Sequence, residues 1–398
     1  KATQDAGRIA GLDVIDVLDE PTAAALAYSF QSQAGASGPA ILPLVQSAGS
    51  ERTVLVYDLG GGTFDVTLVR LAGRRFQCLA IEGDVRLGGK DWDDRIIEHV
   101  ANQFAKRHGT DPRTSPQSLA NLASAAERAK RTLSKLPQTS VTCSHEGKML
   151  TVPLTRQEFE TLTRDLLIRT RMTAQQVLRQ AGVGWEQVDQ VLLVGGSTHM
   201  PMTRQMLQEL SGKQPNSSLA VSEVVARGAA LHAGILAAQK PALAGGPQGA
   251  ARELLGQVVE INVNAHSLGV EVRNRQQERV NNVLIAKNTQ LPAAASRVYY
   301  TVAPDQRVVR VKVLQGEAHR AEDCIPIGEC WIEELAPNLP NHSPIQVRCS
   351  VASNGLIDVL ALDMTSGKMA RTVIHRQSGL TDEEMAREAE WVQSLRIQ

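Results

Sequence analysis

The chain has 398 residues, a length that allows two or three domains with at least one large hydrophobic core. Its 42 basic and 42 acidic residues cancel, and no run gathers five or six like charges, which argues against nucleic acid as the main partner. No apolar run approaches the roughly 20 residues of a membrane-spanning helix, and no signal-peptide pattern opens the chain. The sequence therefore predicts a soluble, cytoplasmic protein with no membrane partner.

The start of the chain reads as a short helix at 4–12, a strand at 12–18 and a helix at 23–28. Glu20 lies at the corner between strand and second helix, where a carboxylate serves either a functional site or, as spacing alone favours, a helix cap. Residues 31–50 are poor in charge and rich in small residues, which predicts a flexible surface insertion. Because the chain opens on Lys1 in a helical pattern, we expect a fragment of a longer protein.

The stretch 54–69 contains two runs of β-branched and apolar residues around three successive glycines, 60–62. Glycines lack a Cβ, so such a turn can adopt positive φ and bring its backbone N–H groups around phosphate oxygens. Asp58 ends the first run, where a carboxylate can hold Mg²⁺ or its water shell, and Thr63 offers a hydroxyl to the same phosphates. The pattern is not a Walker A loop, and an ordinary hairpin with a glycine-rich turn remains the alternative.

Residues 76–81 predict a third strand of the same sheet, and a helix follows the glycine turn at 83–89. A helix between Ser115 and Pro137 carries a polar ridge at 127, 130, 131 and 134, which helix geometry alone assigns to a solvated face. A hairpin at 141–152 precedes the capping box formed by Thr155 and Glu158, which opens a long helix.

A second glycine turn ends the apolar strand at 188–194, and Pro201 then opens a helix that continues through Leu210. Such a turn lets a flat ligand approach the backbone closely. An Ala-rich helix at 224–236 is followed by a composition break at 241–249. Beyond it, strand-like runs recur between turn residues up to 362, the rhythm of an all-β sandwich, and Thr381 caps a terminal helix at 380–395.

Five cysteines without a Cys-x-x-Cys pair disfavour both a disulfide framework and a zinc site, so we expect buried free thiols.

Several blocks along the chain resemble the seventy-kilodalton heat-shock chaperones of DnaK type. They are Gly7–Leu12, Asp19–Ala25, the hairpin Asp58–Asp65, Gly83-Asp84 with Leu87–Gly89, Glu127–Ser134, Leu193–Thr198 and Val313–Glu317. Seven blocks in the family's order are specific, whereas one alone would not be.

The resemblance implies an incomplete actin-like α/β ATPase domain, of which only the second lobe is present, followed by a β-sandwich that binds peptides and a short helical lid. The expected divisions are 1–240 for the nucleotide-binding part, 241–256 for the linker, 257–378 for the sandwich and 379–398 for the lid. Since the sequence contains a single Asp-Leu-Gly, we expect the first lobe to be missing and the chain alone to hydrolyse ATP poorly or not at all.

The resemblance also implies site residues for ATP and Mg²⁺, and it replaces the solvated-face interpretation of the ridge with contacts to adenosine. The expected catalytic residues are Glu20, Asp58 and Thr63, with Asp58 holding Mg²⁺ through water. The expected nucleotide-binding residues are Gly60, Gly61, Gly62, Asp65, Gly88, Gly89, Glu127, Lys130, Arg131, Ser134, Gly195, Gly196, Ser197 and His199.

For the sandwich, the resemblance implies that extended hydrophobic segments of unfolded proteins bind at Val270, Tyr299, Val309 and Val311, whose alternative role is core packing. A J-domain cochaperone and a nucleotide exchange factor are the implied partners. The chain departs from the family pattern in its linker, 254–260, at Lys90, which replaces an acid, at 221–223, which replace Pro-Asp-Glu, and at two further residues. His199 replaces an arginine that stacks on adenine, and Arg273 replaces an apolar residue that arches over the peptide.

Three functions are compatible with these features. The first is an ATP-dependent folding chaperone, and the second is a non-enzymatic peptide-binding or scaffold relative, which the departures at 199, 273 and the linker favour slightly. The third, a sugar kinase with an actin-like core, is disfavoured by the strand-rich region after Gly249.

Overall fold

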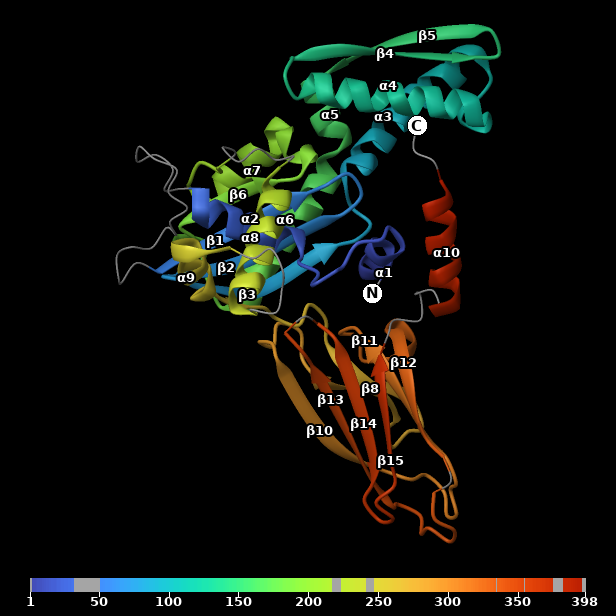
Figure 1. Ribbon diagram of the computed structural model, residues 1–398. Helices are drawn as coiled ribbons and strands as arrows, with labels where there is room; N and C mark the ends of the chain where they lie inside the picture. The colour runs from blue at the N-terminus through green and yellow to red at the C-terminus, as the bar shows by residue number, and fades with distance from the viewer. Residues whose placement is uncertain are drawn as a thin grey trace. The chain divides into compact units, whose positions relative to one another are not determined.

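The structure is a computed structural model that describes residues 2–31, 51–216, 223–240, 247–333, 335–353, 355–374 and 382–395 (Figure 1). Most of the insertion expected at 31–50, and the cap expected at Thr381, lie outside the described residues. The chain forms two compact units, one comprising Asp19–Val259 and the other comprising Lys1–Leu18 with Glu260–Gln398. Among the described helices, none is long and apolar enough to cross a membrane.

The first unit is built on a mixed sheet with the strand order β6-β1-β2-β3. The strands are β1 (Glu51–Leu59), β2 (Phe64–Ala72), β3 (Arg75–Asp84) and β6 (Gln190–Val194). Strand β1 runs antiparallel to β2 and parallel to β6. The hairpin predicted at 54–69 and the strand predicted at 188–194 therefore lie side by side. The third strand expected at 76–81 is confirmed as β3.

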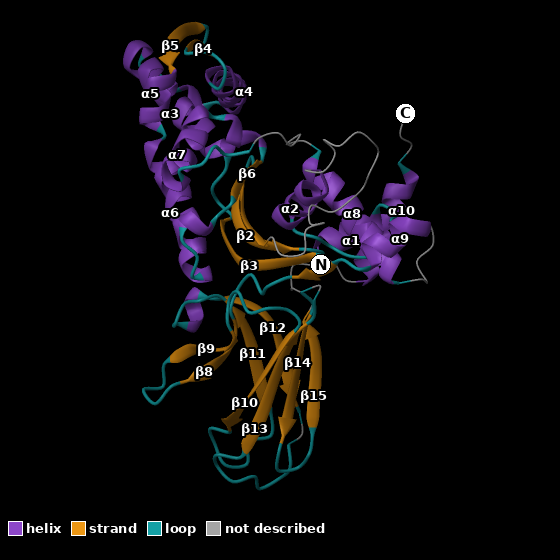
Figure 2. Ribbon diagram, turned by 90° about the vertical axis from the view of Figure 1, so that its left-hand side faces the viewer, coloured by secondary structure: helices purple, strands orange, loops and turns teal. Residues whose placement is uncertain are grey.

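Helices cover both faces of this sheet, which explains why β1 is an almost continuous run of buried residues (Figure 2). Leu55, Tyr57 and Leu59 point to one face, where they join the core formed with helices α3 (Gly89–His108), α4 (Pro116–Leu133), α6 (Arg164–Ala181) and α7 (Pro201–Ser211). Val54 and Val56 alternate to the other face and pack with α2 (Glu20–Gln31), α8 (Val224–Gln239) and α9 (Gly249–Gly256).

Helix α4 packs against a two-stranded sheet, β4 (Gln138–His145) and β5 (Lys148–Thr155). The Ser115 side chain accepts a hydrogen bond from the Ser118 N–H at the start of α4, with Pro116 in the first turn. Thr155 and Glu158 form the capping box that was expected, and it opens α5 (Arg156–Leu162). These caps were therefore confirmed, but the long helix expected after the capping box is divided at Thr163 into α5 and α6.

The second unit contains the expected β-sandwich, whose two sheets have the orders β12-β11-β8-β9 and β10-β13-β14-β15. Their bounds are β8 (Leu268–Arg273), β9 (Arg279–Ile285), β10 (Ala293–Tyr300), β11 (Val309–Gln315), β12 (Ile325–Ile332), β13 (Pro344–Val351), β14 (Ile357–Asp363) and β15 (Met369–Ile374). Apolar residues from both sheets share one core. The unit also contains α1 (Ala2–Ile9) and α10 (Asp382–Ser394), which contact each other.

The strand expected at 12–18 is not formed, and this prediction was wrong. The segment follows α1 as irregular chain, and Leu12 is 65% exposed. A strand is stable only when a neighbouring strand takes up its backbone hydrogen bonds, and no described strand pairs with this segment.

The described part of the expected linker, 247–256, is more ordered than its composition indicated. Residues 249–256 form α9, which packs against α8, and the Gln239 side-chain amide donates to the Val258 carbonyl oxygen at 2.8 Å. Val259, which begins the short strand β7 (Val259–Ile261), donates its N–H to the Arg74 carbonyl oxygen at 2.9 Å. The compact units consequently divide between Val259 and Glu260.

All five cysteines are free and buried, as expected from their spacing.

Candidate functional site: a glycine-lined cradle

Two glycine turns meet at one edge of the first unit's sheet because β1 and β6 are parallel and end together. Asp58 lies beside Val194 in this register, so the turn after β1 and the turn at 195–197 adjoin. The carboxyl ends of parallel strands are where α/β proteins bind ligands. The edge therefore gathers backbone groups from segments that are more than 130 residues apart in sequence.

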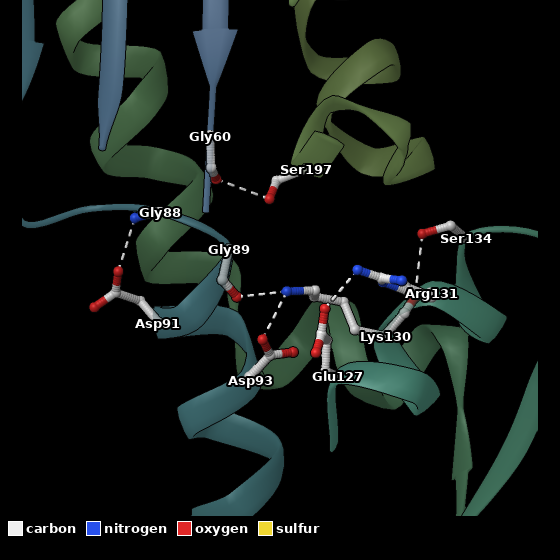
Figure 3. A network of polar contacts seen from close by, with 10 residues as sticks. All are labelled: Gly60, Gly88, Gly89, Asp91, Asp93, Glu127, Lys130, Arg131, Ser134 and Ser197. Atoms are coloured by element: carbon white, nitrogen blue, oxygen red, sulfur yellow. Dashed lines mark hydrogen bonds and ion pairs between the residues drawn. The ribbon is translucent and has the colours of Figure 1, made fainter. Parts of the chain in front are cut away.

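A third segment, at the start of α3, joins these two through the carbonyl oxygens of the hairpin turn. Figure 3 shows the contact between Gly60 and Ser197. The Gly60 carbonyl oxygen accepts hydrogen bonds from the Ser197 hydroxyl and the Gly89 N–H, each at 2.9 Å. The Gly61 carbonyl oxygen accepts from the Lys90 N–H at 2.8 Å. The three segments 60–63, 88–90 and 195–197 form one unit, which we call the glycine cradle.

Glycine is required in the cradle mainly because the backbones approach one another so closely. A Cβ on Gly88 would lie 2.4 Å from the Gly62 nitrogen, and a Cβ on Gly195 would lie 2.3 Å from the Leu59 carbonyl oxygen. Gly195 also has a φ of +83°, which disfavours any residue with a side chain. The hairpin glycines 60–62 do not use positive φ, so that part of the expectation was wrong. A Cβ would meet nothing within 4 Å at Gly61 or Gly62, so close approach excludes a side chain at Gly88 and Gly195 and not at these two.

The outer groups of the hairpin turn are available to a ligand. Gly61, Gly62 and Thr63 are exposed, and neither the two glycine N–H groups nor the Thr63 hydroxyl donates a hydrogen bond to any described residue. Exposed N–H groups without partners can donate to an anionic oxygen. The turn is therefore able to bind phosphate.

Lys130 connects α4 to the cradle, although helix geometry alone placed it on a solvated face. Its ammonium group donates to the Gly89 carbonyl oxygen at 2.7 Å and forms an ion pair with Asp93 at 2.8 Å (Figure 3). Only 9% of Lys130 is exposed. Burial raises the pKa of Asp93, and the hydrogen bond from Lys130 opposes that rise.

The rest of the polar ridge on α4 lies beside Lys130 but remains open to solvent. Glu127 and Arg131 form an ion pair at 2.6 Å, one helical turn apart, and both are largely exposed. The Ser134 hydroxyl donates to the Lys130 carbonyl oxygen at 3.1 Å. The solvated-face interpretation was thus wrong for Lys130 alone.

Acidic side chains converge on the inner side of the cradle. Asp58 is 5% exposed and stands opposite Asp65 in the β1–β2 register. Burial, with Glu20 and Asp65 adding repulsion, raises the pKa of Asp58 to about 7. The pKa of Asp65 is also raised, first by burial and then by Glu20 and Asp19.

These carboxylates fit a magnesium ion that keeps most of its water shell. A divalent cation would offset the converging negative charge. The described residues contain no group of three or more His, Cys, Asp or Glu side chains that could hold a metal by themselves. Mg²⁺ is usually held by one or two carboxylates together with water and phosphate oxygens, which matches this donor set.

Not every expected residue joins the network. Gly196 and His199 are exposed on the turn after Gly195, and no described contact links the His199 side chain to the cradle. Conversely, no role was predicted for Asp91 or Asp93, yet Asp91 accepts the Gly88 N–H at 2.7 Å and Asp93 pairs with Lys130. Two acidic residues within four positions after a Gly-Gly pair were the available signal for both.

The four residues expected to bind peptide lie in the second unit, in or against the sandwich core. Val270 and Val311 are 3% and 4% exposed, while Val309 and Tyr299 are half-buried and pack against the same core. The Tyr299 hydroxyl donates to Asn282 at 2.9 Å, and burial raises the pKa of Tyr299 to about 12. Arg273 is exposed and donates to the Gln277 carbonyl oxygen.

The chain matches curated relatives along nearly its whole length. It is 37% identical over 401 residues to "Chaperone protein DnaK" of Deinococcus proteolyticus, covering 98% of this chain and 58% of that protein. It is 38% identical to "Chaperone protein DnaK" of Thermus thermophilus (97% and 58%) and 37% identical to "Heat shock 70 kDa protein 7, chloroplastic" of Arabidopsis thaliana (98% and 51%). The chain thus spans between half and three fifths of the length of these relatives.

A family comparison agrees with these matches and extends over the glycine cradle and the sandwich together. The family described as "Hsp70 protein" matches residues 1–396. The chain therefore belongs to the Hsp70 family.

Proposed function

We propose that this chain forms part of an ATP-dependent molecular chaperone that binds exposed hydrophobic peptide segments under the control of ATP binding and hydrolysis. The observation that carries the proposal is the glycine cradle, where three backbone segments and Lys130 meet beside the raised-pKa carboxylate of Asp58. The relatives named as chaperones support it.

In this proposal each group at the cradle has its own role. The N–H groups of Gly61 and Gly62 and the Thr63 hydroxyl would donate to phosphate oxygens, as would Ser197 after a small rotation. Asp58 and Asp65 would hold the magnesium ion, which screens phosphate charge when bound, and Glu20 would orient the attacking water. The exposed pair Glu127–Arg131 and Ser134 would contact adenosine, with Lys130 fixing α4 against Gly89.

In this proposal residues 1–240 bind nucleotide, residues 257–378 bind peptide, and residues 379–398 form the start of a lid. A J-domain cochaperone and a nucleotide exchange factor would be the partners, in the cytoplasm. With one Asp-Leu-Gly hairpin in the sequence, we expect the chain alone to bind nucleotide but to hydrolyse it slowly.

The test is a titration of the 398-residue chain with a fluorescent ATP analogue, in MgCl₂ and in EDTA. We expect Mg²⁺-dependent binding that weakens at least tenfold in Lys130→Gln, while Lys135→Gln, a change in the exposed turn that follows the same helix, has no effect. A parallel titration measures an extended hydrophobic peptide. Peptide binding without any nucleotide binding would contradict the proposal and favour the non-enzymatic peptide-binding alternative.

A further inference from the structure

A groove on the first unit lies between the end of α5 and helices α6 and α7, with a volume of about 370 Å³. None of its lining residues belongs to the glycine cradle. Its floor consists of Leu167, Met202 and Met206, and the side of Ile168, which is 47% exposed, continues that apolar surface outward. An exposed isoleucine above two methionines is apolar surface that nothing in the first unit covers.

The rim of the groove along α6 is basic. Arg164 and Arg171 line it, both are exposed, and neither forms an ion pair or a hydrogen bond with any described residue. By contrast, Arg169, on another side of the same helix, pairs with Asp84 at 2.5 Å. Arg169, outside the groove, is thus paired with an acid of the chain, whereas the two arginines inside the groove are not.

Two acidic side chains also line the groove. Glu209 lies on α7, facing α6, where its carboxylate accepts a hydrogen bond from Gln205 at 2.9 Å, and Glu160 lies at the end of α5. The groove therefore has an apolar floor between two arginines on α6 and a carboxylate on α7. A ligand that matches it must be apolar in the middle and carry opposite charges on its two flanks.

We propose that this groove binds an amphipathic helix of a partner protein, which sets apolar side chains on the floor and acidic side chains against Arg164 and Arg171. Seven residues separate the two arginines, about two helical turns, so acids seven residues apart on one flank of a helix meet both. Two helices side by side form a groove that accepts a third helix, recognised through anchors at i, i+3, i+4 and i+7.

The composition of the floor supports a helix over a rigid small molecule. Methionine side chains are flexible and polarisable, so Met202 and Met206 can adapt to the branched side chains of a helix. Guanidinium groups bind carboxylates in a bidentate fork, which selects acidic over basic flanks. A basic flank against Arg164 and Arg171 would instead meet like charge, so the groove also discriminates against the wrong orientation.

The test uses two hydrocarbon-stapled helical peptides of 14 residues with identical apolar faces. One carries Glu on the flank that faces α6 and Lys on the other, and the second has these charges exchanged. Binding to the full 398-residue chain is measured by fluorescence anisotropy at low salt and in 0.5 M NaCl. Because a stapled helix cannot extend, it does not compete for a site that binds extended peptides in the β-sandwich.

We expect the peptide with the acidic α6 flank to bind at least tenfold more tightly than its counterpart, with the preference reduced in high salt. Arg164→Glu with Arg171→Glu should reverse the preference, and Ile168→Asp should weaken both peptides. The matched control, Lys106→Glu with Arg107→Glu on the exposed end of α3, should leave both affinities unchanged. Circular dichroism of each variant verifies that the helices are retained.

Three results would overturn the proposal. If the two peptides bind with equal affinity, the arginines do not select the flank of the helix. If no groove variant changes the affinity, the peptides bind at another site. If sedimentation shows that the chain self-associates and Arg164→Glu with Arg171→Glu makes it monomeric, the occupant is a second copy. Nucleotide binding is measured on the same samples, so loss of the ATP function does not affect the outcome.

Discussion

Asp58 and Asp65 stand directly opposite each other across the β1–β2 hairpin, with one further pair, Leu59 and Phe64, between them and the glycine turn. Both carboxyl groups have raised pKa values, and burial is the first cause for each. Two neighbouring carboxylates that are shielded from water lower the stability of the fold unless a cation offsets their charge. The pair therefore links proton binding, metal binding and the stability of the first unit.

This pair predicts that stability falls as pH rises from about 4 to about 7. The folded protein holds a proton on Asp58 up to pH about 7, whereas the unfolded chain releases it near the usual value of 3.8, so the folded state binds more protons in this window. The loss is at most on the order of 4 kcal/mol. Urea unfolding at pH 5 and pH 8, followed by fluorescence of the buried Trp92, measures it.

In Asp58→Asn the pH dependence should flatten, with a residual slope from Asp65. MgCl₂ with nucleotide should restore stability to the original chain at pH 8 and not to Asp58→Asn. Asp305→Asn, on an exposed loop of the second unit, serves as the control. A pH slope that is the same in Asp58→Asn as in the original chain would show that other groups cause it.

Removal of the Lys130 ammonium should destabilise the first unit. Lys130→Met leaves Asp93 buried without its ion pair and leaves the Gly89 carbonyl oxygen without a donor, at a cost of about 2–3 kcal/mol. The double variant Lys130→Met with Asp93→Leu should recover part of that loss, because no buried charge is then left alone. A double-mutant cycle based on urea unfolding gives the coupling free energy between Lys130 and Asp93. If the two changes in unfolding free energy were strictly additive, the ion pair would not contribute to stability.

Two Gly→Ala substitutions can distinguish the free-energy cost of a steric clash from the cost of a strained backbone conformation. Gly73 has a φ of +62° with open space around it, so Gly73→Ala costs only the left-handed strain, about 1 kcal/mol. Gly195 has φ +83° and ψ 140°, a region that only glycine adopts readily, so Gly195→Ala carries more backbone strain and also brings a Cβ to 2.3 Å from the Leu59 carbonyl oxygen. We expect Gly195→Ala to lose clearly more unfolding free energy and to weaken nucleotide binding, whereas Gly73→Ala leaves binding unchanged. Similar losses in both would rule out a tight cradle.

Features set by neighbouring residues were predictable from the sequence. The hairpin at 54–69 and the capping box of Thr155 and Glu158 depend on residues a few positions apart, and the structure shows both. The role of Lys130 was not predictable from helix geometry, because the group that buries it, Gly89, lies 41 residues earlier. Only the family resemblance pointed to that ridge.

Strands whose existence depends on a partner were the weakest part of the sequence analysis. Residues 12–18 alternate as a strand should, yet remain irregular because no described strand pairs with them. Strand β15 was missed because Met369, Ala370 and Arg371 show no apolar alternation, and its pairing with β14 forms it. Alternation records which side of a strand can be buried, and pairing decides whether the strand forms.

Substitutions of two nearby valines on β11 should distinguish residues that pack in the sandwich core from residues that bind peptide. Val311 is almost completely buried, so Val311→Ala removes core contacts and should cost about 2 kcal/mol of unfolding free energy. Val309 is half-buried, so Val309→Ala should cost less stability and instead weaken the binding of an extended hydrophobic peptide several-fold.

Hydrogen exchange of β11 and peptide titration on the same samples measure the two effects, with the highly exposed Val302→Ala as the control for both. If Val309→Ala binds peptide as tightly as the original chain, Val309 is a core residue and the peptide site lies elsewhere on the sandwich.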